Sequence, residues 1–293
     1  MNWTPADLPS FAGRSVIVTG ANSGLGLVTA RELARVGAKV IVACRNEQKG
    51  AAAAAGMTGD VQVRRLDLED LASVRDFADT IGEVDVLVNN AGIMAVPYAL
   101  TKDGFERQIG TNHLGHFALT NLLLPKITDR VVTVSSAMHI NGWLSLNDLN
   151  WKTRPYSAWL SYGQSKLANL LFTSELQRRL TAAGSAVKAH AAHPGYSATN
   201  LQGHAGNNGK SFVVRLTELL AIAKVASPSP EDGAVPTLYA ASQDLPPDSF
   251  IGPKFITRGP VGPTPRSPQA RSSKTARGLW QLSEQLTGTE FPL

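Results

Sequence analysis

Short apolar runs alternate with stretches of helical periodicity along the first two thirds of the chain. The β-branched run at 15–19 predicts a buried strand, and apolar side chains at helical spacing over 24–36 predict the helix that follows it. Gly37 stands where that helix should stop. The alternation continues and predicts further strands at 39–43, 61–66, 84–88, 130–134 and 187–192.

Near-continuous apolar strands that are separated by helices are typical of a parallel sheet with both faces covered. No linker interrupts the alternation between residues 15 and 192. The sequence therefore predicts an α/β fold with a single doubly wound, Rossmann-like parallel sheet, helices on both of its faces, and one domain over residues 1–293.

The pattern loosens after residue 194. Apolar residues at helical spacing predict a helix at 212–225, which is either a lid over an apolar substrate or a surface helix packed by one stripe. Residues 246–293 form an extension rich in proline and arginine, for which we expect extended structure that follows the surface. A last helix at 275–286 is expected to dock through Leu279, Leu282 and Leu286.

The composition, 43% hydrophobic and 17% charged, is that of a globular chain and not of a disordered or fibrous one. Cys44 is the only cysteine, which excludes a disulfide framework and a cysteine-based zinc cage. No apolar run approaches the ~18 residues of a membrane span. Asp7 and Pro9 do not fit a secretory signal, so we expect a cytoplasmic protein.

The net charge of +5 is concentrated near the C-terminus. Residues 249–283 contain six basic side chains and no acidic one, so the rest of the chain sums to −1. A nearly neutral remainder removes the argument for nucleic-acid binding. The basic segment predicts either peripheral contact with an anionic membrane surface or a solvated tail that wraps its own domain.

Three glycines mark the turn between the first predicted strand and the first predicted helix. Gly20 permits a tight turn, Gly24 lets the backbone approach a pyrophosphate, and Gly26 lets the helix pack close to the strand. The helix N-terminus would then face the phosphates with free N–H groups. The alternative is a plain flexible turn. We expect Asn22, Ser23 and Leu25 of the same turn to bind the cofactor with the glycines.

The end of the second predicted strand bears on the choice of nicotinamide cofactor. An acidic residue at this point would bond the ribose 2′-hydroxyl of NAD, whereas this chain has Arg45 and no acid before Glu47. A guanidinium pairs well with a 2′-phosphate, so we expect NADP. The alternative is that Arg45 is a solvated residue at the start of a helix.

Polar groups that suit carbonyl chemistry converge on one edge of the predicted sheet. Tyr162 and Lys166 share one helical face at i and i+4. Ser135 and Ser136 follow the strand at 130–134, and residues 89–92 follow the strand at 84–88. Ligands of open α/β sheets bind at this carboxyl edge.

With these motifs in this order, the chain resembles the classical short-chain dehydrogenase/reductase family over roughly residues 12–200. The matching pieces are residues 19–26, Asp67-Leu68, residues 89–92, Asn112, Ser135-Ser136, Tyr162 with Lys166, and Pro194-Gly195 with Thr199. A finer likeness is to the branch of retinol dehydrogenases, WW-domain oxidoreductase and protochlorophyllide reductase. It rests on the segments at 103–106, 111–117, 148–151 and 164–172.

The resemblance implies a catalytic role for four residues. Tyr162 is the general acid/base, and a nearby Lys166 ammonium plus an oxidised nicotinamide would lower the pKa of its phenol from about 10. Ser136 hydrogen-bonds the substrate oxygen, with Ser135 as the fallback. Lys166 also holds the nicotinamide ribose. Asn112 kinks its helix and holds a water that relays protons to Lys166.

The resemblance also implies further cofactor contacts. Asp67 bonds the adenine amine with Leu68 beside it. Asn89, Ala91 and Gly92 line the adenosine ribose, and the alternative for them is a strand-ending turn. The nicotinamide is embraced by Pro194, Gly195 and Thr199.

The separation of 26 residues between Ser136 and Tyr162 is about twice that of minimal family members. The inserted segment holds Trp143, Trp151, Tyr156 and Trp159, which either wall an apolar pocket or bury a long loop. Before this segment in the sequence, His113 and His116 lie three residues apart, but they have no evident carboxylate or cysteine partner for a metal site. We therefore expect packing or helix-surface roles for both histidines and no metal site.

The sequence thus predicts an NADP(H)-dependent oxidoreductase that acts on a hydroxyl or carbonyl of a small apolar alcohol, aldehyde or ketone. Two alternatives stay open: an NADP-binding regulatory protein of the same fold without turnover, and a reductase of carbon–carbon double bonds. A homodimer or homotetramer is common in the family, with the helices of Asn112 and Tyr162 often at the interface.

Overall fold

A computed structural model describes residues 3–195, 229–255 and 259–293. Its elements follow the chain as β1 (Ser15–Thr19), α1 (Gly24–Arg35), β2 (Lys39–Cys44), α2 (Glu47–Ala54), β3 (Val61–Arg65), α3 (Leu71–Asp79), β4 (Val84–Asn89), α4 (Arg107–Ile109), α5 (Gly115–Leu123), β5 (Ile127–Val134), α6 (Ala158–Ala182), β6 (Lys188–Ala192), α8 (Pro230–Ser242), β7 (Phe250–Pro253), β8 (Val261–Pro263) and α9 (Ser273–Thr287). The predicted helix at 212–225 and Thr199 lie outside the described residues.

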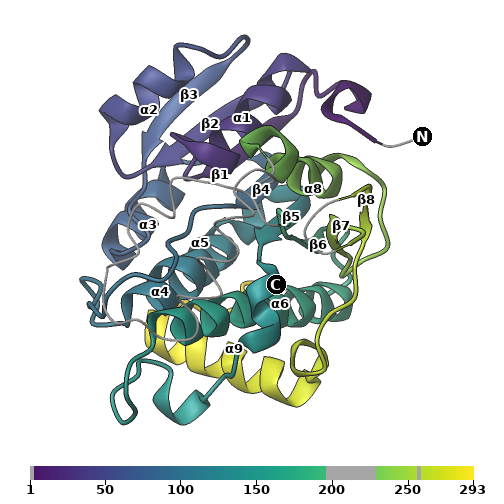
Figure 1. The fold of residues 1–293 in the computed structure, drawn as a ribbon. Coiled ribbons are helices and arrows are strands. Elements are labelled where there is room, and N and C mark those ends of the chain that lie inside the picture. Colours follow the sequence, from purple (N-terminus) through teal and green to yellow (C-terminus); the bar gives the residue numbers. More distant parts are fainter. Residues whose placement is uncertain (1–2, 196–228, 256–258) are drawn as a thin grey trace.

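The described strands form one sheet in the order β3-β2-β1-β4-β5-β6-β7-β8. All neighbouring pairs are parallel except β7 and β8, which are antiparallel. The chain reverses direction across the sheet between β1 and β4, and a crevice at such a switch point is the usual ligand site of doubly wound folds. The predicted α/β fold is confirmed (Figure 1).

Alternation along the central strands sends side chains to two separate cores. In β1, Ile17 packs on the side of α3, α5 and α6, whereas Val16 and Val18 pack on the side of α1 and α8. This is the period of two expected for a strand that is buried on both faces. Because both faces are apolar and covered, the sequence shows these strands as continuous apolar runs.

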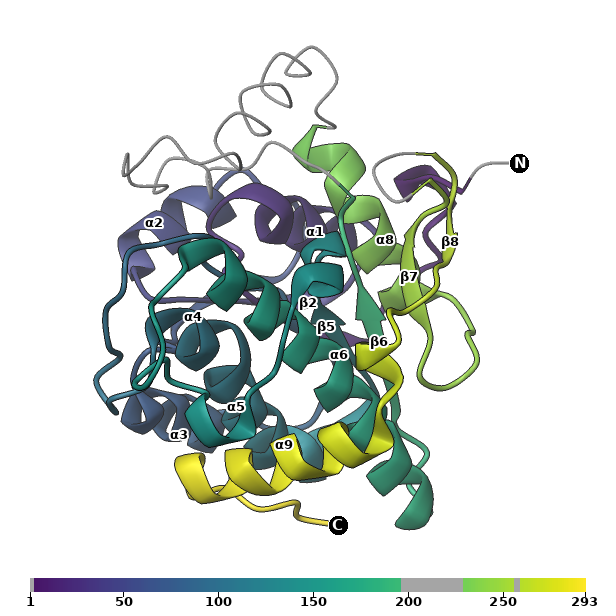
Figure 2. The same ribbon diagram turned by 60° about the horizontal axis from the view of Figure 1, so that its bottom comes forward.

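The C-terminal extension corrects two predictions. It does not simply follow the surface, because β7 pairs with β6 and so extends the main sheet, and β8 makes the sheet not wholly parallel. Helix α9 lies along α6 and α5 (Figure 2), where Trp280 is buried and stacks on Phe172 with ring centres 5.7 Å apart. Leu279 is buried as predicted, and Leu282 and Leu286 are partly buried.

The basic side chains of the extension are not all free in solvent. Arg266 binds the carboxylate of Asp248 in a two-pronged pair, with its Nη1 2.8 Å from Oδ2 and its Nη2 2.7 Å from Oδ1. Its side chain is only 10% exposed. Arg266 therefore joins two parts of the extension, the segment after β8 and the turn before β7.

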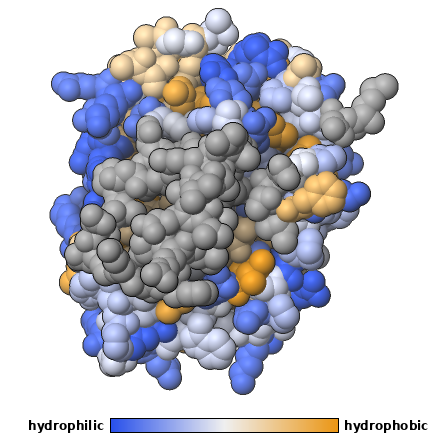
Figure 3. Space-filling view, viewed as in Figure 1, coloured by the Kyte–Doolittle hydropathy of each residue, from blue (hydrophilic) through white to orange (hydrophobic). Residues whose placement is uncertain are grey.

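The face of the molecule seen in Figure 3 shows no broad apolar area outside its grey region. On the face seen in Figure 3, the hydrophobic side chains outside the grey region form small separate patches. Trp143, at 70% exposed, is the most exposed large hydrophobic side chain among the described residues. No described helix is both long enough and apolar enough to cross a membrane.

Candidate functional site: a pocket at the carboxyl edge of the sheet

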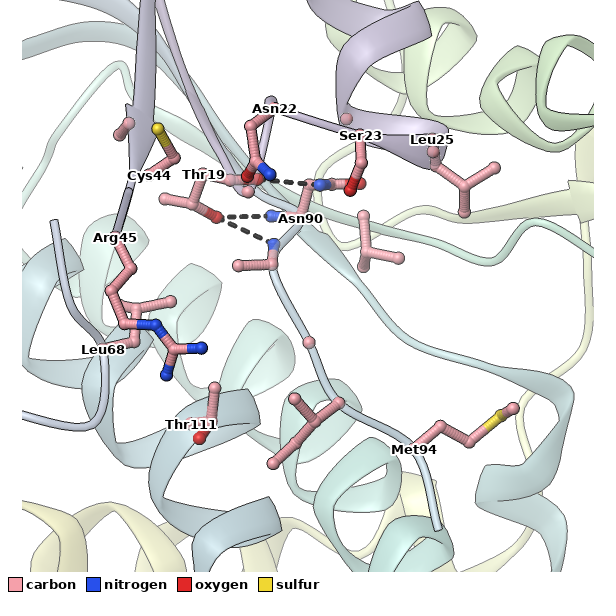
Figure 4. A pocket seen from close by; sticks show the side chains of 18 of the residues that line it. Thr19, Asn22, Ser23, Leu25, Cys44, Arg45, Leu68, Asn90, Met94 and Thr111 are labelled. Atoms are coloured by element: carbon pink, nitrogen blue, oxygen red, sulfur yellow. Dashed lines mark hydrogen bonds between the residues drawn. The ribbon is translucent and has the colours of Figure 1, made fainter. Parts of the chain in front are cut away.

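A pocket of about 410 Å³ opens at the carboxyl ends of β1, β2, β4 and β5. It is lined by fourteen of the predicted site residues: Gly20, Asn22, Ser23, Gly24, Leu25, Gly26, Arg45, Asp67, Leu68, Ala91, Gly92, Tyr162, Lys166 and Pro194. Figure 4 shows Asn22, Ser23 and Leu25 at one end, Met94 at the other, and Arg45 with Leu68 along one side. The sheet therefore brings together residues that are more than 170 positions apart in the sequence.

The glycine-rich turn has a backbone conformation and packing that leave little room for side chains. Gly20 and Gly24 have left-handed φ angles of 67° and 56°. A Cβ on Gly26 would lie 2.7 Å from the carbonyl oxygen of Gly20. Ser23 stands at the N-cap of α1, yet its side chain makes no capping hydrogen bond. The first turn of α1 therefore keeps free N–H groups, as an anionic pyrophosphate requires.

Thr19 joins the glycine-rich turn to the loop after β4. Its hydroxyl oxygen accepts the backbone N–H groups of Asn90 and Ala91, both at 2.9 Å (Figure 4). Asn90 also donates from its side chain to the Thr19 carbonyl at 2.7 Å, and it lines the pocket. Asn89, which the resemblance placed in the pocket, points into the core and donates to Thr120 at 2.9 Å. The alternation of β4 sends these two neighbouring amides to opposite sides.

Arg45 does not stand alone at the side of the pocket. Its Nη1 lies 3.3 Å from Oε1 of Glu69, and Oε2 of the same carboxylate accepts from Nε of Arg107 at 2.9 Å. All three residues line the pocket, and the Arg45 side chain is 61% exposed. Glu69 and Arg107 could not be predicted as partners of Arg45, because Glu69 follows β3 and Arg107 begins α4, and neither shares a local motif with Arg45.

Tyr162 and Lys166 are buried on adjacent turns of α6 and both line the pocket. Nζ of Lys166 donates to the Val134 carbonyl at the end of β5 at 3.1 Å. Burial raises the pKa of Tyr162 to about 12, against the lowering effect of a hydrogen bond with Ser136. Burial also lowers the pKa of Lys166 to about 8. The protein chain by itself therefore does not lower the pKa of Tyr162, because a buried phenolate loses solvation.

The two serines after β5 have different partners. Ser135 is buried, and its hydroxyl donates to the Lys166 carbonyl at 2.8 Å. The Ser136 hydroxyl oxygen accepts the Met138 N–H at 3.2 Å, and its side chain interacts with the Tyr162 phenol. The geometry therefore favours Ser136 over Ser135 as the group that faces a substrate oxygen, although Ser135 and not Ser136 lines the pocket.

Asn112 lies in a π-helical turn, Gly110–Leu114, between α4 and α5. Its side-chain oxygen accepts the Ile93 N–H at 2.8 Å, and its side-chain nitrogen donates to the Ile93 carbonyl at 3.0 Å and to Ser165 at 2.8 Å. The amide thus ties the loop after β4 to α6. A Cβ on Gly92 would lie 3.1 Å from Oδ1 of Asn112 and 3.3 Å from Nζ of Lys166, so a side chain at this position would crowd both groups.

The remaining predicted residues lie near the pocket or in the core. Gly195 follows Pro194 but does not line the pocket. His113 and His116 are both buried, so of the two expected roles the packing role is confirmed and the helix-surface role is not. His113 contacts the Ser283 hydroxyl at 2.9 Å, and His116 contacts the Thr19 hydroxyl at 2.9 Å.

The aromatic segment between Ser136 and Tyr162 buries a loop more than it walls the pocket. Trp151 is buried, and the Tyr156 hydroxyl lies 3.0 Å from the Val96 carbonyl oxygen and 3.1 Å from a carboxylate oxygen of Glu106, either of which can accept its one proton. Trp143 is exposed, and none of the predicted aromatic residues of this segment lines the pocket in the described part of the chain.

Comparison with known proteins places this chain in a family. The family model of short chain dehydrogenases matches residues 14–209. Human retinol dehydrogenase 13 is 45% identical over 97% of this chain and 87% of its own length. An uncharacterized protein from Mycobacterium paratuberculosis is 63% identical, with all of both chains covered and a TM-score of 0.88. A gluconate 5-dehydrogenase-like structure from Beutenbergia cavernae with bound NADP is 28% identical over 80% of this chain and 91% of its own, with a TM-score of 0.58. The chain belongs to the short-chain dehydrogenase/reductase family, in its retinol dehydrogenase branch.

Proposed function

We propose that this protein, acting as a single domain, is an NADP(H)-dependent oxidoreductase of a hydroxyl or carbonyl group on a small apolar molecule, with Tyr162 as the general acid/base. The observation that carries the proposal is the pocket itself. Tyr162 and Lys166 are buried at one part of its wall, and the glycine-rich turn forms another. A nicotinamide dinucleotide that spans these parts would present its reactive carbon beside the phenol.

The residues present fit such a cofactor. The free N–H groups of the first turn of α1 suit a pyrophosphate, and Gly20 and Gly26 leave no room for side chains there. Arg45 and Arg107 bring two guanidinium groups to the adenosine side, where the carboxylates of Asp67 and Glu69 also line the pocket. The guanidinium of Arg45, which lines the pocket and is 61% exposed, supports NADP over NAD, because a guanidinium pairs well with the anionic 2′-phosphate.

In carbonyl reduction, bound NADPH supplies the hydride to the carbonyl carbon. Tyr162 gives its phenolic proton to the oxygen, so that the π bond of the carbonyl is replaced by a C–H bond and an O–H bond while the C–O single bond remains. Ser136 donates a hydrogen bond to the same oxygen as negative charge develops on it. A protonated Lys166 stabilises the phenolate that is left behind. Alcohol oxidation runs through the same steps in reverse.

An apolar substrate is supported by the pocket wall beyond the tyrosine. The loop after β4, which Asn112 binds at Ile93, contributes Ile93, Met94 and Val96, and all three line the pocket. Met94 lies at the end away from the glycine-rich turn (Figure 4). The relative named retinol dehydrogenase 13 supports the same substrate class, an apolar alcohol or its aldehyde.

The test is turnover on a panel of apolar aldehydes, ketones and alcohols, followed at the nicotinamide absorbance band with NADP(H) and NAD(H) in parallel. We expect carbonyl-dependent oxidation of NADPH, with the alcohol as product. Tight cofactor binding without turnover would instead support a regulatory protein. A product with a saturated carbon–carbon bond and an intact carbonyl would support a double-bond reductase.

A further inference from the structure

A buried histidine connects the serine at the active site to the C-terminal extension. His139 lies in a short 3-10 helix, Ala137–Asn141, directly after Ser136, and it is 2% exposed. Its ring packs edge-on against Phe250 of β7, with ring centres 5.6 Å apart. Both of its ring nitrogens have backbone partners: Ser136 next to the active site and Ser267 in the C-terminal extension.

The partners determine the tautomer of His139. Nδ1 lies 2.7 Å from the Ser136 carbonyl oxygen, which can only accept a hydrogen bond, so Nδ1 carries a proton. Nε2 lies 3.3 Å from the backbone nitrogen of Ser267, which can only donate, so Nε2 carries none. Burial and the nearby Arg266 guanidinium lower the pKa of His139, and the ring is therefore neutral near pH 7.

The contacts around Ser136 leave the proton of its hydroxyl without a backbone acceptor among the described residues. The Ser136 carbonyl accepts two donors, the imidazole Nδ1–H and the backbone N–H of His139 at 3.1 Å. The Ser136 hydroxyl oxygen accepts the Met138 N–H at 3.2 Å. Its own proton is then available to Tyr162 or to a substrate oxygen. The orientation of this hydroxyl thus depends on the backbone that the imidazole clamps.

We propose that His139 is a positioning residue, which fixes Ser136 for catalysis and links it to the backbone of Ser267 in the C-terminal extension. The proposal rests on the proposed function, because Ser136 needs a substrate oxygen to act on. It gives the extension a role in the active site. Phe250 and Ser267, which touch His139 from two sides, both come from residues 246–293.

Two substitutions separate the two ring nitrogens. An Asn side chain places its NH₂ near the position of Nδ1, so His139→Asn keeps the donor to Ser136 and loses the acceptor for Ser267. A Gln side chain reaches the position of Nε2, so His139→Gln keeps the contact with Ser267 and loses the donor to Ser136. We expect kcat to fall about tenfold in His139→Gln, the effect of one lost hydrogen bond, and to fall clearly less in His139→Asn.

The KM for NADPH should stay within about twofold in both variants, because a hydrogen bond to Ser136 does not touch the cofactor. The matched controls are His190→Asn and His190→Gln. His190 is also a buried histidine, on β6, and its ring nitrogens have no hydrogen-bond partner among the described residues. The control pair should show equal kcat values. Equal losses in the two His139 variants would overturn the proposal and leave His139 a packing residue.

A structural measurement decides the same question without turnover. In crystal structures of the two variants, we expect the Ser136 carbonyl and hydroxyl to be displaced in His139→Gln and to keep their places in His139→Asn. Nitrogen NMR of histidine-labelled protein should show the Nδ1–H tautomer for His139. An undisplaced Ser136 in both variants, or the Nε2–H tautomer, overturns the proposal. An inactive wild type would instead count against the proposed function alone.

Discussion

Nζ of Lys166 lies 5.7 Å from the centre of the Tyr162 ring, held there by the Val134 carbonyl at 3.1 Å. A charge at this point favours the phenolate and so assists proton transfer from the phenol. Burial, however, lowers the pKa of Lys166 to about 8, so the lysine keeps its charge only below that pH. The pH dependence of catalysis should therefore report on the lysine and not on the tyrosine.

We expect kcat for carbonyl reduction to be level below pH 8 and to fall as the pH rises through about 8. Tyr162, with a pKa near 12, stays protonated throughout this window and remains a proton donor. The measurement is kcat against pH at saturating NADPH and substrate. A rate that stays constant well above pH 8 would show that the charge on Lys166 is not needed.

Replacing the general acid should separate catalysis from binding. Tyr162→Phe removes only the phenolic oxygen, so we expect turnover to fall by at least about a hundredfold while the affinity for NADPH changes little. The matched control is Tyr239→Phe. Tyr239 lies on α8 and packs against Trp3, so this substitution should leave kcat unchanged. An equal loss of binding and turnover in Tyr162→Phe would indicate a structural tyrosine.

The cofactor preference should depend on the sign of the charge at residue 45. Arg45→Asp removes the cation and adds a carboxylate beside Glu69, so we expect kcat/KM for NADPH to fall by about tenfold to a hundredfold, and the ratio to NADH to shift towards NADH. Arg277→Asp makes the same charge change on an exposed position of α9 and should leave the ratio alone. An unchanged ratio in Arg45→Asp would remove the 2′-phosphate assignment.

The glycine-rich turn should not tolerate a single methyl group at Gly26. A Cβ there would lie 2.7 Å from the Gly20 carbonyl oxygen, so we expect Gly26→Ala to cost about 1–3 kcal/mol of stability and to weaken NADPH binding. Gly82→Ala is the matched control, because a Cβ at Gly82 meets nothing within 4 Å. Thermal melting with and without NADPH measures both effects, and equal behaviour of the two variants would contradict the close packing.

Acid stability should depend on a histidine that has no partner. His190 is fully buried, both ring nitrogens lack a hydrogen-bond partner among the described residues, and burial lowers its pKa to about 4. The unfolded chain binds this proton below about pH 6.5, and the folded chain binds it only below about pH 4. This contribution to folding stability is therefore complete above pH 6.5 and is lost as the pH falls towards 4.

His190→Leu removes this titration at similar volume. We expect the variant to lose less stability between pH 6.5 and 4 than the wild type does, by up to roughly 3 kcal/mol. Unfolding by urea at several pH values measures the difference. Parallel stability curves for the two proteins would show that His190 does not titrate on unfolding.

The first six strands could be predicted from the sequence, because each is buried on both faces and appears as an apolar run. The structure differs by only a few residues, most at β5, which begins at Ile127 and not at residue 130. Helix α8 and strands β7 and β8 were not predicted from the sequence. The strands are short and contain Gly252 and two prolines, and α8 holds Pro236 inside the helix, so local propensity argues against all three. Packing against β6 and α1 overrides that propensity.

The sequence by itself determined the fold class, the glycine-rich turn and the pair Tyr162–Lys166, because each depends on a short stretch with a fixed period or spacing. Only the tertiary structure decided that Glu69 stands beside Arg45, that Asn89 faces the core, and that His139 joins Ser136 to Ser267. It also decided that the pKa of Tyr162 is raised. The physical reason is that these properties depend on which distant segments exclude water from a group and which atoms they offer in its place, and periodicity along the chain carries no information about either.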